Sequence, residues 1–349
     1  MRRSIRSALA AVALTTIAGT TIAGMASAAS DPPGGVPLPV HECQRACLEG
    51  YMNKYLAAMA AHQADPGLFA ANVRFTENGI ELPFGTEGLW ATASGLGNYK
   101  FYVPDVETQQ VAFMGTMMEQ ASSSAAGPQR PAEPVGIDVR LRIDASGKIS
   151  EVEQIVARPD RPLGPAPAAS SSPFPATGVA VEAMGAPNAI FLQTIPENQR
   201  ESRADLIAVA NQYFTGMQRN DGKGYYPFTD DCLRHENGMI SAGPGGTIGM
   251  RGQPVMTCKK QFETALKGVV TGIRDRRFVA VDRERGIVFA FAAFDHRPID
   301  WTWELGELFK IEGNKIRRIE AIFIRGPYGV CSGWGTYEQC RSEQIQDVR

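Results

Sequence analysis

The sequence predicts an α+β protein in which one type of domain occurs twice, and three observations support this. Each half of the chain begins with an amphipathic helix and continues with short strands separated by turns. The halves repeat the same short motifs in the same order. A segment rich in Pro, Ala, Ser and Gly separates them. We therefore expect two domains, each with helices packed on an antiparallel sheet, joined by a flexible linker.

Apolar residues at spacings of three and four predict the two helices. The helices align with each other, so that Tyr55-Leu56 matches Tyr213-Phe214 and Met59 matches Met217. Further along, Glu77-Asn78-Gly79 matches Glu236-Asn237-Gly238. Three matches in order indicate a repeated unit rather than chance.

Runs of β-prone residues follow each helix and predict a meander of adjacent antiparallel strands. The predicted strands span residues 100–103, 110–118, 137–143 and 149–156 in the first half, and 278–281, 287–295, 301–311 and 316–325 in the second. The last strand of each half follows a matching turn, Gly147-Lys148-Ile149 or Asn314-Lys315-Ile316.

The N-terminus has the features of a secretory signal peptide. Arg2, Arg3 and Arg6 precede an uncharged apolar run that ends in Ala26-Ser27-Ala28. Export places the mature protein outside the cell or in the periplasm. The predicted parts are a signal peptide (1–28), a first domain (40–158), a linker (159–197), a second domain (198–327) and a C-terminal tail (328–349). Ile190-Phe191-Leu192 leaves open a structured segment in the later part of the linker.

Six cysteines in an exported chain favour disulfide bonds. Proximity favours Cys331 with Cys340, and Cys232 and Cys258 lie in the same predicted domain. Cys43 and Cys47 stand one helical turn apart. The spacings do not fit a zinc site, so we expect no metal.

The composition excludes some partners. A net charge of −2 without a dense basic cluster argues against nucleic acid. After the signal peptide, no segment is long and apolar enough to span a membrane. The expected partner is a small molecule, and a homodimer is left open.

The order of helices and then a curved sheet resembles the cone-shaped superfamily of nuclear transport factor two, which includes SnoaL-like cyclases, scytalone dehydratase and ketosteroid isomerase. A closer resemblance is to secreted fungal and bacterial proteins of unassigned activity. It rests on segments such as Arg234-His235-Glu236-Asn237-Gly238, Phe294-Asp295-His296 and Arg325-Gly326-Pro327-Tyr328-Gly329. The resemblance implies two cones, each with a pocket between its helices and the inner face of its sheet.

Candidate catalytic residues lie in the second half. His235 is the natural proton-transfer group, with Glu236 or Asp295 to orient it and Arg234 to stabilise negative charge. Asp295 and His296 end a strand on opposite faces, so only one of them can face inward.

The other candidates have structural alternatives. Asn237 fits a turn, Arg274 and Asp275 fit a solvated ion-paired run, and Trp303 fits a core or lid aromatic. Glu320, like Glu153 in the first half, fits either the cone or a pair across the sheet. As substrate-binding residues we expect Arg234, Asn237, Arg274, Asp275, His296, Trp303 and Glu320.

The sequence contains no dinucleotide fingerprint, phosphate loop, HExxH or nucleophile elbow, so no cofactor is expected. The leading hypothesis is a lyase or isomerase that performs acid–base chemistry on a small, partly apolar or aromatic metabolite. The alternatives are a non-catalytic protein that binds a small molecule, and a structural or dimerisation module.

Overall fold

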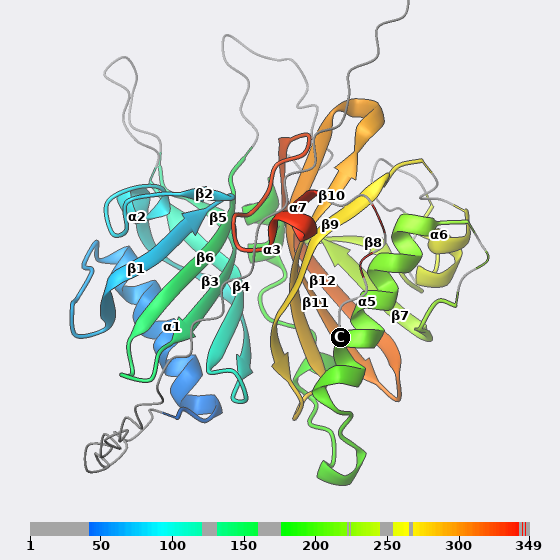
Figure 1. The fold of residues 1–349 in the computed structure, drawn as a ribbon, viewed down its shortest axis with the longest axis horizontal. Coiled ribbons are helices and arrows are strands. Elements are labelled where there is room, and N and C mark those ends of the chain that lie inside the picture. Colours follow the sequence, from blue (N-terminus) through cyan, green and yellow to red (C-terminus); the bar gives the residue numbers. More distant parts are fainter. Residues whose placement is uncertain are drawn as a thin grey trace, which may run out of the picture. The chain divides into compact units, whose positions relative to one another are not determined.

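The computed structural model describes residues 42–120, 131–159, 176–221, 223, 225–244, 254–264, 268–341, 344 and 346. The predicted signal peptide and the first part of the predicted linker, residues 160–175, lie outside this range. Figure 1 shows two sheets, each with a long helix beside it.

The first sheet has the strand order β2-β1-β6-β5-β4-β3. Its long helix α1, Arg45–Ala60, buries one stripe that includes Leu48, Met52 and Tyr55. The other elements are β1 (Phe69–Glu77), β2 (Ile80–Glu81), α2 (Leu89–Thr92), β3 (Ala93–Asp105), β4 (Gln110–Glu119), β5 (Glu133–Ile143) and β6 (Ile149–Ala157).

The second sheet has the corresponding order, β8-β7-β12-β11-β10-β9. Its long helix α5, Arg203–Arg219, is preceded by the N-cap residue Ser202, whose side chain accepts from the Asp205 N–H. The other elements are β7 (Phe228–Glu236), β8 (Met239–Ala242), α6 (Cys258–Thr264), β9 (Gly272–Asp282), β10 (Ile287–His296), η3 (Arg297–Ile299), β11 (Trp301–Glu312), β12 (Lys315–Pro327) and α7 (Tyr337–Arg341). The α+β class and the two-sheet architecture agree with the prediction.

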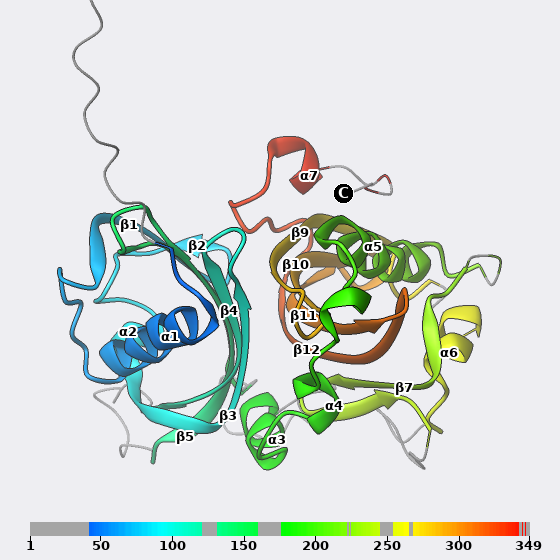
Figure 2. The ribbon, with the colours of Figure 1, turned by 90° about the horizontal axis from the view of Figure 1, so that it is seen from below.

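The sheets are mixed rather than purely antiparallel. β1 pairs with β6 in parallel, and β7 pairs with β12 in parallel, whereas the other pairs are antiparallel. After β2 or β8 the chain crosses to the far edge of its sheet and returns as a four-strand meander. The last strand therefore arrives beside the first and runs in the same direction. Figure 2 shows each sheet curving around its helices.

The two Asn-Gly pairs form hairpin turns, as the turn interpretation predicts. Asn78 and Gly79 have φ of 53° and 73°, and Asn237 and Gly238 have φ of 50° and 77°. Two successive residues with positive φ are typical of the type I′ turn that joins two short antiparallel strands.

A third apolar cluster lies between the two sheets. It combines residues of β3 and β4 with residues of β9, β10 and β12, such as Phe101, Met114, Phe289 and Ile322. Residues Val40–Arg349 accordingly form one compact unit. Both faces of each sheet are thus covered, one by helices and one by the other sheet.

The later part of the predicted linker contains helices and is packed against the sheets. α3 (Thr177–Ala183) and α4 (Ala189–Leu192) place Val181 and Phe191 in the cluster between the sheets, and η1 (Glu197–Gln199) follows. For residues 176–197 the flexible interpretation is therefore wrong, because these apolar side chains are buried rather than solvated.

All six cysteines form disulfides, with the pairings Cys43–Cys47, Cys232–Cys258 and Cys331–Cys340. The predicted disulfides are confirmed. In the described part of the chain, no helix has the length and apolarity needed to cross a membrane.

Candidate functional site

Arg234 and Glu236 face the helix-covered interior of the second sheet. Alternate residues of a strand share a face, and these two share theirs with the core residue Cys232. Both are buried, at 2% and 8% exposed. Arg234 Nη2 lies 3.4 Å from Glu236 Oε2. The predicted cation and carboxylate therefore meet inside the second half.

The guanidinium of Arg234 is held by three elements. Its Nε donates to Ser241 Oγ on β8 at 2.8 Å, and Nη1 donates to the Tyr213 hydroxyl on α5 at 3.1 Å. Nη2 donates to Gln261 Oε1 on α6 at 2.5 Å. The positive charge is consequently fixed in place within an apolar core.

Glu307 on β11 lies beside this group. Glu307 pairs in register with Ala321, which pairs with Glu236 across the next strand. Its carboxyl shares a hydrogen bond with the Tyr213 hydroxyl. Burial raises the pKa of Glu307 to about 8 and raises the pKa of Tyr213 well above its usual value. Near neutral pH, Glu307 therefore holds a proton that it can give up.

Two carboxyl oxygens of this cluster lack a hydrogen-bond partner. Glu236 Oε2 and Glu307 Oε2 are buried, and neither makes a hydrogen bond to a described residue. Buried polar atoms are nearly always satisfied by protein, water or ligand. Glu236 Oε2 has only the ion pair with Arg234 at 3.4 Å, and Glu307 Oε2 has no contact of this kind among the described residues. We refer to Tyr213, Arg234, Glu236 and Glu307 as the inner cluster.

His296 also faces this interior, on the same side of β10 as Phe294. Its ring lies over Trp303 at 4.1 Å between centroids, and Trp303 stacks on Phe323 at 4.6 Å. Burial lowers the pKa of His296 and favours the neutral ring. His296 Nδ1 contacts the Phe294 carbonyl, while Nε2 is buried without a partner among described residues.

Asp295 points to the opposite face, so the expectation that it works in the cone with His235 is not met. Arg274 donates to its carboxylate from Nε at 2.5 Å and from Nη2 at 2.8 Å, and the Thr302 hydroxyl donates to it at 2.7 Å. The β10 alternation allows only one of Asp295 and His296 inside, and the apolar residues that share the face of His296 form the core. Asp295 is thus part of a satisfied ion pair.

His235 lies on the outer face of β7, since it alternates with Arg234 and Glu236. Burial and the nearby Arg318 lower its pKa. β12 and β11 separate β7 from β10. The predicted assembly of His235 with Asp295 is therefore not formed, and Glu236 points away from His235.

Two other candidates have structural contacts. Asn237 supports its turn by exchanging hydrogen bonds with the backbone of Phe323. Glu320 faces the first sheet, where the Tyr99 hydroxyl donates a short hydrogen bond to it. Burial raises the pKa of Glu320 to about 7. Of the two placements predicted for Glu320, neither describes this contact between sheets.

The run from Arg274 to Arg277 lies within β9, where Arg274 to Arg276 are buried and Arg277 is partly buried, so the solvated interpretation is wrong. Arg274 also donates to the Val330 carbonyl of the C-terminal tail, and Asp275 accepts from the Ser332 hydroxyl. Arg277 binds Glu153 of the first sheet with two nitrogens at 2.6 and 2.7 Å. These charges therefore join the second sheet to the tail and to the first sheet.

The interior of the first sheet differs at the matching positions. Strand register aligns Gln154 with Ala321 and Val139 with Glu307. Glu77, the counterpart of Glu236, accepts from Gln154 Nε2, the Leu89 N–H and Arg158. The first half thus satisfies its single carboxylate with hydrogen bonds, whereas the second half carries two carboxyl groups that each keep one oxygen without a hydrogen bond to a described residue.

Sequence reasoning missed Glu307, Tyr213, Ser241 and Gln261. Glu307 lies on the same face of β11 as the core residues Leu305 and Phe309. An acidic residue between two apolar residues of one strand face was the signal that the sequence offered. Tyr213 was recognised only as an apolar helix residue. Ser241 and Gln261 stand near no motif.

Comparison with protein families adds one match. Residues 199–323 match the model of a family described as a domain of unknown function (DUF8021), a range that runs from just before α5 to β12. A search of curated proteins found no match.

Three solved structures are similar to about a third of the chain. A de novo designed protein with a curved β-sheet has 15% identity and a TM-score of 0.25, covering 36% of this chain and 88% of that one. PrhC from Penicillium brasilianum has 14% identity and a TM-score of 0.24, with coverages of 36% and 83%. An NTF2-like protein from Anabaena variabilis has 15% identity and a TM-score of 0.22, with coverages of 36% and 95%.

Proposed function

We propose that this is an exported lyase or isomerase whose inner cluster performs acid–base chemistry on a small, partly apolar metabolite. The observation that carries the proposal is the pair of buried carboxyl oxygens, on Glu236 and Glu307, that have no hydrogen-bond partner among the described residues. They flank a fixed arginine within an aromatic core that includes Tyr213 and Phe309.

Each member of the inner cluster has a distinct role in this proposal. Glu236 takes a proton from a carbon next to a carbonyl group. Glu307, with a pKa of about 8, donates to the oxygen on which negative charge develops. The Tyr213 hydroxyl accepts from Arg234 and hydrogen-bonds the Glu307 carboxyl, which positions both groups, and Arg234 stabilises that charge.

Export is part of the same proposal. It is supported by the Arg-rich start, the apolar run and the Ala-Ser-Ala site of the sequence. The three disulfides favour an oxidising compartment. Mass spectrometry of the secreted protein should find a new N-terminus near Ala29, and intact Met1 in that fraction would contradict export.

The test of the activity is proton exchange in D₂O, followed by ¹H NMR on a panel of small aromatic ketones and β-hydroxy ketones. Both lyases and isomerases of this type must remove a proton from carbon, so exchange reports either reaction. We expect Glu236→Gln and Glu307→Gln each to lower the exchange rate by roughly 10²-fold or more.

Tyr55→Phe is the matched control for Tyr213→Phe. Both tyrosines are buried on the long helix of their half, but Tyr55 bonds Gln154 in the first sheet. Only Tyr213→Phe should slow exchange.

His235→Ala tests which residues transfer the proton. If His235 were the proton-transfer group, as the sequence predicts, this variant would lose exchange activity. Because His235 lies outside the inner cluster, we expect the variant to retain it.

The alternative is a binding protein that uses the same interior without turnover. Its support is the apolar character of this interior, which includes Phe214, Phe262 and Phe309. A ketone bound equally by wild type and Glu236→Gln, with no exchange in either, would replace the enzyme proposal by this one.

A further inference from the structure

Two reciprocal ion pairs join the halves at one junction. Arg203, the first residue of α5, binds Asp105 at the end of β3 at 2.5 Å. Arg45, the first residue of α1, binds Asp282 at the end of β9 at 2.6 Å. Each helix is thus tied to the strand end of the other half.

The two aspartates also stand at the start of matching turns. Asp105 pairs with Gln110 across one turn, and Asp282 pairs with Ile287 across the other, five residues apart in both cases. Each aspartate accepts from the N–H three residues on, that of Thr108 or Arg285. The two sites are therefore equivalent in structure.

One hydrogen bond breaks this equivalence. Asp105 Oδ2 accepts a further bond at 3.0 Å from the N–H of Val281, the residue before Asp282. The residue before Asp105 is Pro104, which has no N–H to return to Asp282. Asp282 is only 3% exposed, and its Oδ2 has no hydrogen-bond partner in the described part of the chain.

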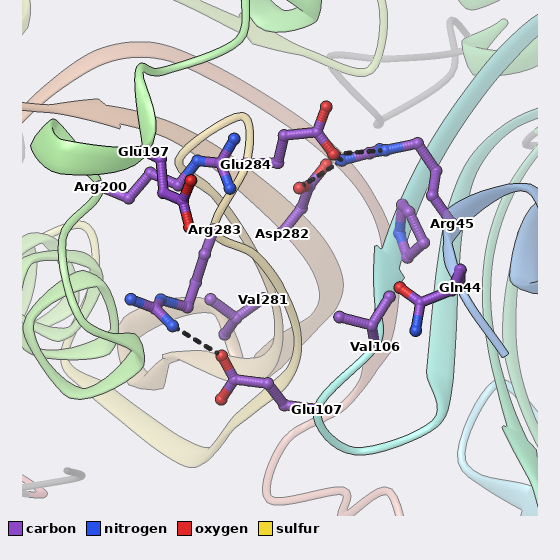
Figure 3. Close-up of a pocket in the computed structure, with 11 residues that line it drawn as sticks. Gln44, Arg45, Val106, Glu107, Glu197, Arg200, Val281, Asp282, Arg283 and Glu284 are labelled. Carbon is purple, nitrogen blue, oxygen red and sulfur yellow. Dashed lines mark hydrogen bonds and ion pairs between the residues drawn. The ribbon is translucent and has the colours of Figure 1, made fainter. Parts of the chain in front are cut away.

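Asp282, which has this one oxygen without a hydrogen bond, lines a cleft of about 290 Å³. Figure 3 shows the cleft, with Arg45 bridging Asp282 and Glu284 and with Arg283 paired to Glu107 at its edge. The lining residues are Gln44, Arg45, Pro104, Val106, Glu107, Glu197, Arg200, Val281, Asp282, Arg283 and Glu284.

Arg200 supplies the opposite charge within the cleft. Its Nε donates to the Ile195 carbonyl at 3.0 Å, which fixes the side chain. Figure 3 shows its guanidinium extending toward Glu284 and Asp282. A guanidinium in this position is suited to a carboxylate, which it binds with two parallel hydrogen bonds.

We propose that this cleft binds a free α-amino acid. The ammonium group donates to Asp282 Oδ2 and replaces the N–H that Pro104 lacks, and the carboxylate binds Arg200. The charged lining residues are three arginines and four acids, which disfavours a dianion and suits a molecule with one charge of each sign. The site lies apart from the inner cluster and does not depend on its activity.

Calorimetric titration of the full mature protein with glycine and L-alanine tests the proposal. Methylammonium lacks the carboxylate, acetate lacks the ammonium, and glycine betaine lacks every N–H. We expect the amino acids to bind at least tenfold more tightly than all three. Equal binding of acetate or betaine, or no amino-acid binding at 10 mM, would overturn the proposal and leave an ordered water as the partner of Asp282.

Two variants make the test specific. Pro104→Ala supplies the missing N–H, so it should weaken amino-acid binding at least tenfold while the unliganded protein stays folded. Pro66→Ala, at an exposed loop position, controls for the loss of proline rigidity and should bind as the wild type does. Arg200→Ala should remove the preference for amino acids over methylammonium. Unchanged affinity in Pro104→Ala would contradict the role assigned to Asp282.

Discussion

Glu307 is a glutamate buried in an aromatic core, at 1% exposed, without a salt-bridge partner of its own among the described residues. Burial raises its pKa to about 8 from 4.5. Between these values the folded chain keeps a proton that the unfolded chain releases. The free energy of unfolding should therefore fall as the pH rises from about 4.5 to about 8.

Glu307→Gln should remove part of this dependence. One pKa unit corresponds to about 1.4 kcal/mol, so Glu307 alone accounts for a few kcal/mol across this interval. Burial also raises the pKa of Glu304 and of Glu320 to about 7. These two residues should therefore leave part of the pH dependence of the free energy of unfolding in the variant. Urea unfolding from pH 4 to 9 measures the effect. If the free energy of unfolding falls as steeply with pH in Glu307→Gln as in the exposed control Glu81→Gln, the assignment of this dependence to Glu307 is wrong.

At the scale of the element, β10 shows why the candidate residues were only partly predictable. Every one of its ten residues is buried, because helix α5 and the core cover one face and the first sheet covers the other. An apolar pattern on both faces cannot indicate which face is the interior. The existence of the strand was therefore predictable from Ile287–Asp295, whereas the orientation of Asp295 and His296 required the packing partner.

The close packing of helix α3 can be tested by mutation. It packs on the first sheet, and a Cβ at Gly178 would overlap the carbonyl of Pro134. On its other side, a Cβ at Gly238 would meet the backbone of Ala180. Gly178→Ala should thus destabilise the protein by about 2 kcal/mol or more.

Gly50→Ala is the matched control, because Gly50 lies within α1 with no atom near its added Cβ. Since alanine is the better helix former, it should stabilise the protein by up to about 1 kcal/mol. Opposite shifts of the thermal midpoint would confirm the close packing of α3. Equal shifts would show that α3 does not touch the sheet.

For the whole molecule, the sequence allowed the repeat to be predicted, but it did not allow the packing of the two halves against each other to be predicted. Each motif match lies within one half, whereas pairs such as Arg277–Glu153 and Arg203–Asp105 join residues about 100 positions apart or more. Sequence spacing carries no information on such pairs. The prediction of two domains joined by a flexible linker therefore did not include the apolar cluster between the sheets.

The shared cluster predicts one cooperative unfolding transition for residues 40–349. Differential scanning calorimetry should show a single peak, and Arg277→Ala should lower its midpoint because Glu153 then loses a buried partner. Expressed alone, residues 40–159 should be unstable, because Phe101, Met114 and Ile155 lose their cover. Two separated peaks in the intact protein would indicate halves that unfold independently.

The proposed reaction requires that the second half holds a carboxyl group able to exchange a proton near neutral pH. The most direct measurement is a ¹³C NMR titration of the glutamate carboxyl carbons, with Glu307 assigned by comparison with Glu307→Gln. We expect a midpoint for Glu307 of about 8. A midpoint near 4.5, the ordinary value for glutamate, would contradict the claim and remove the proton donor from the proposed reaction.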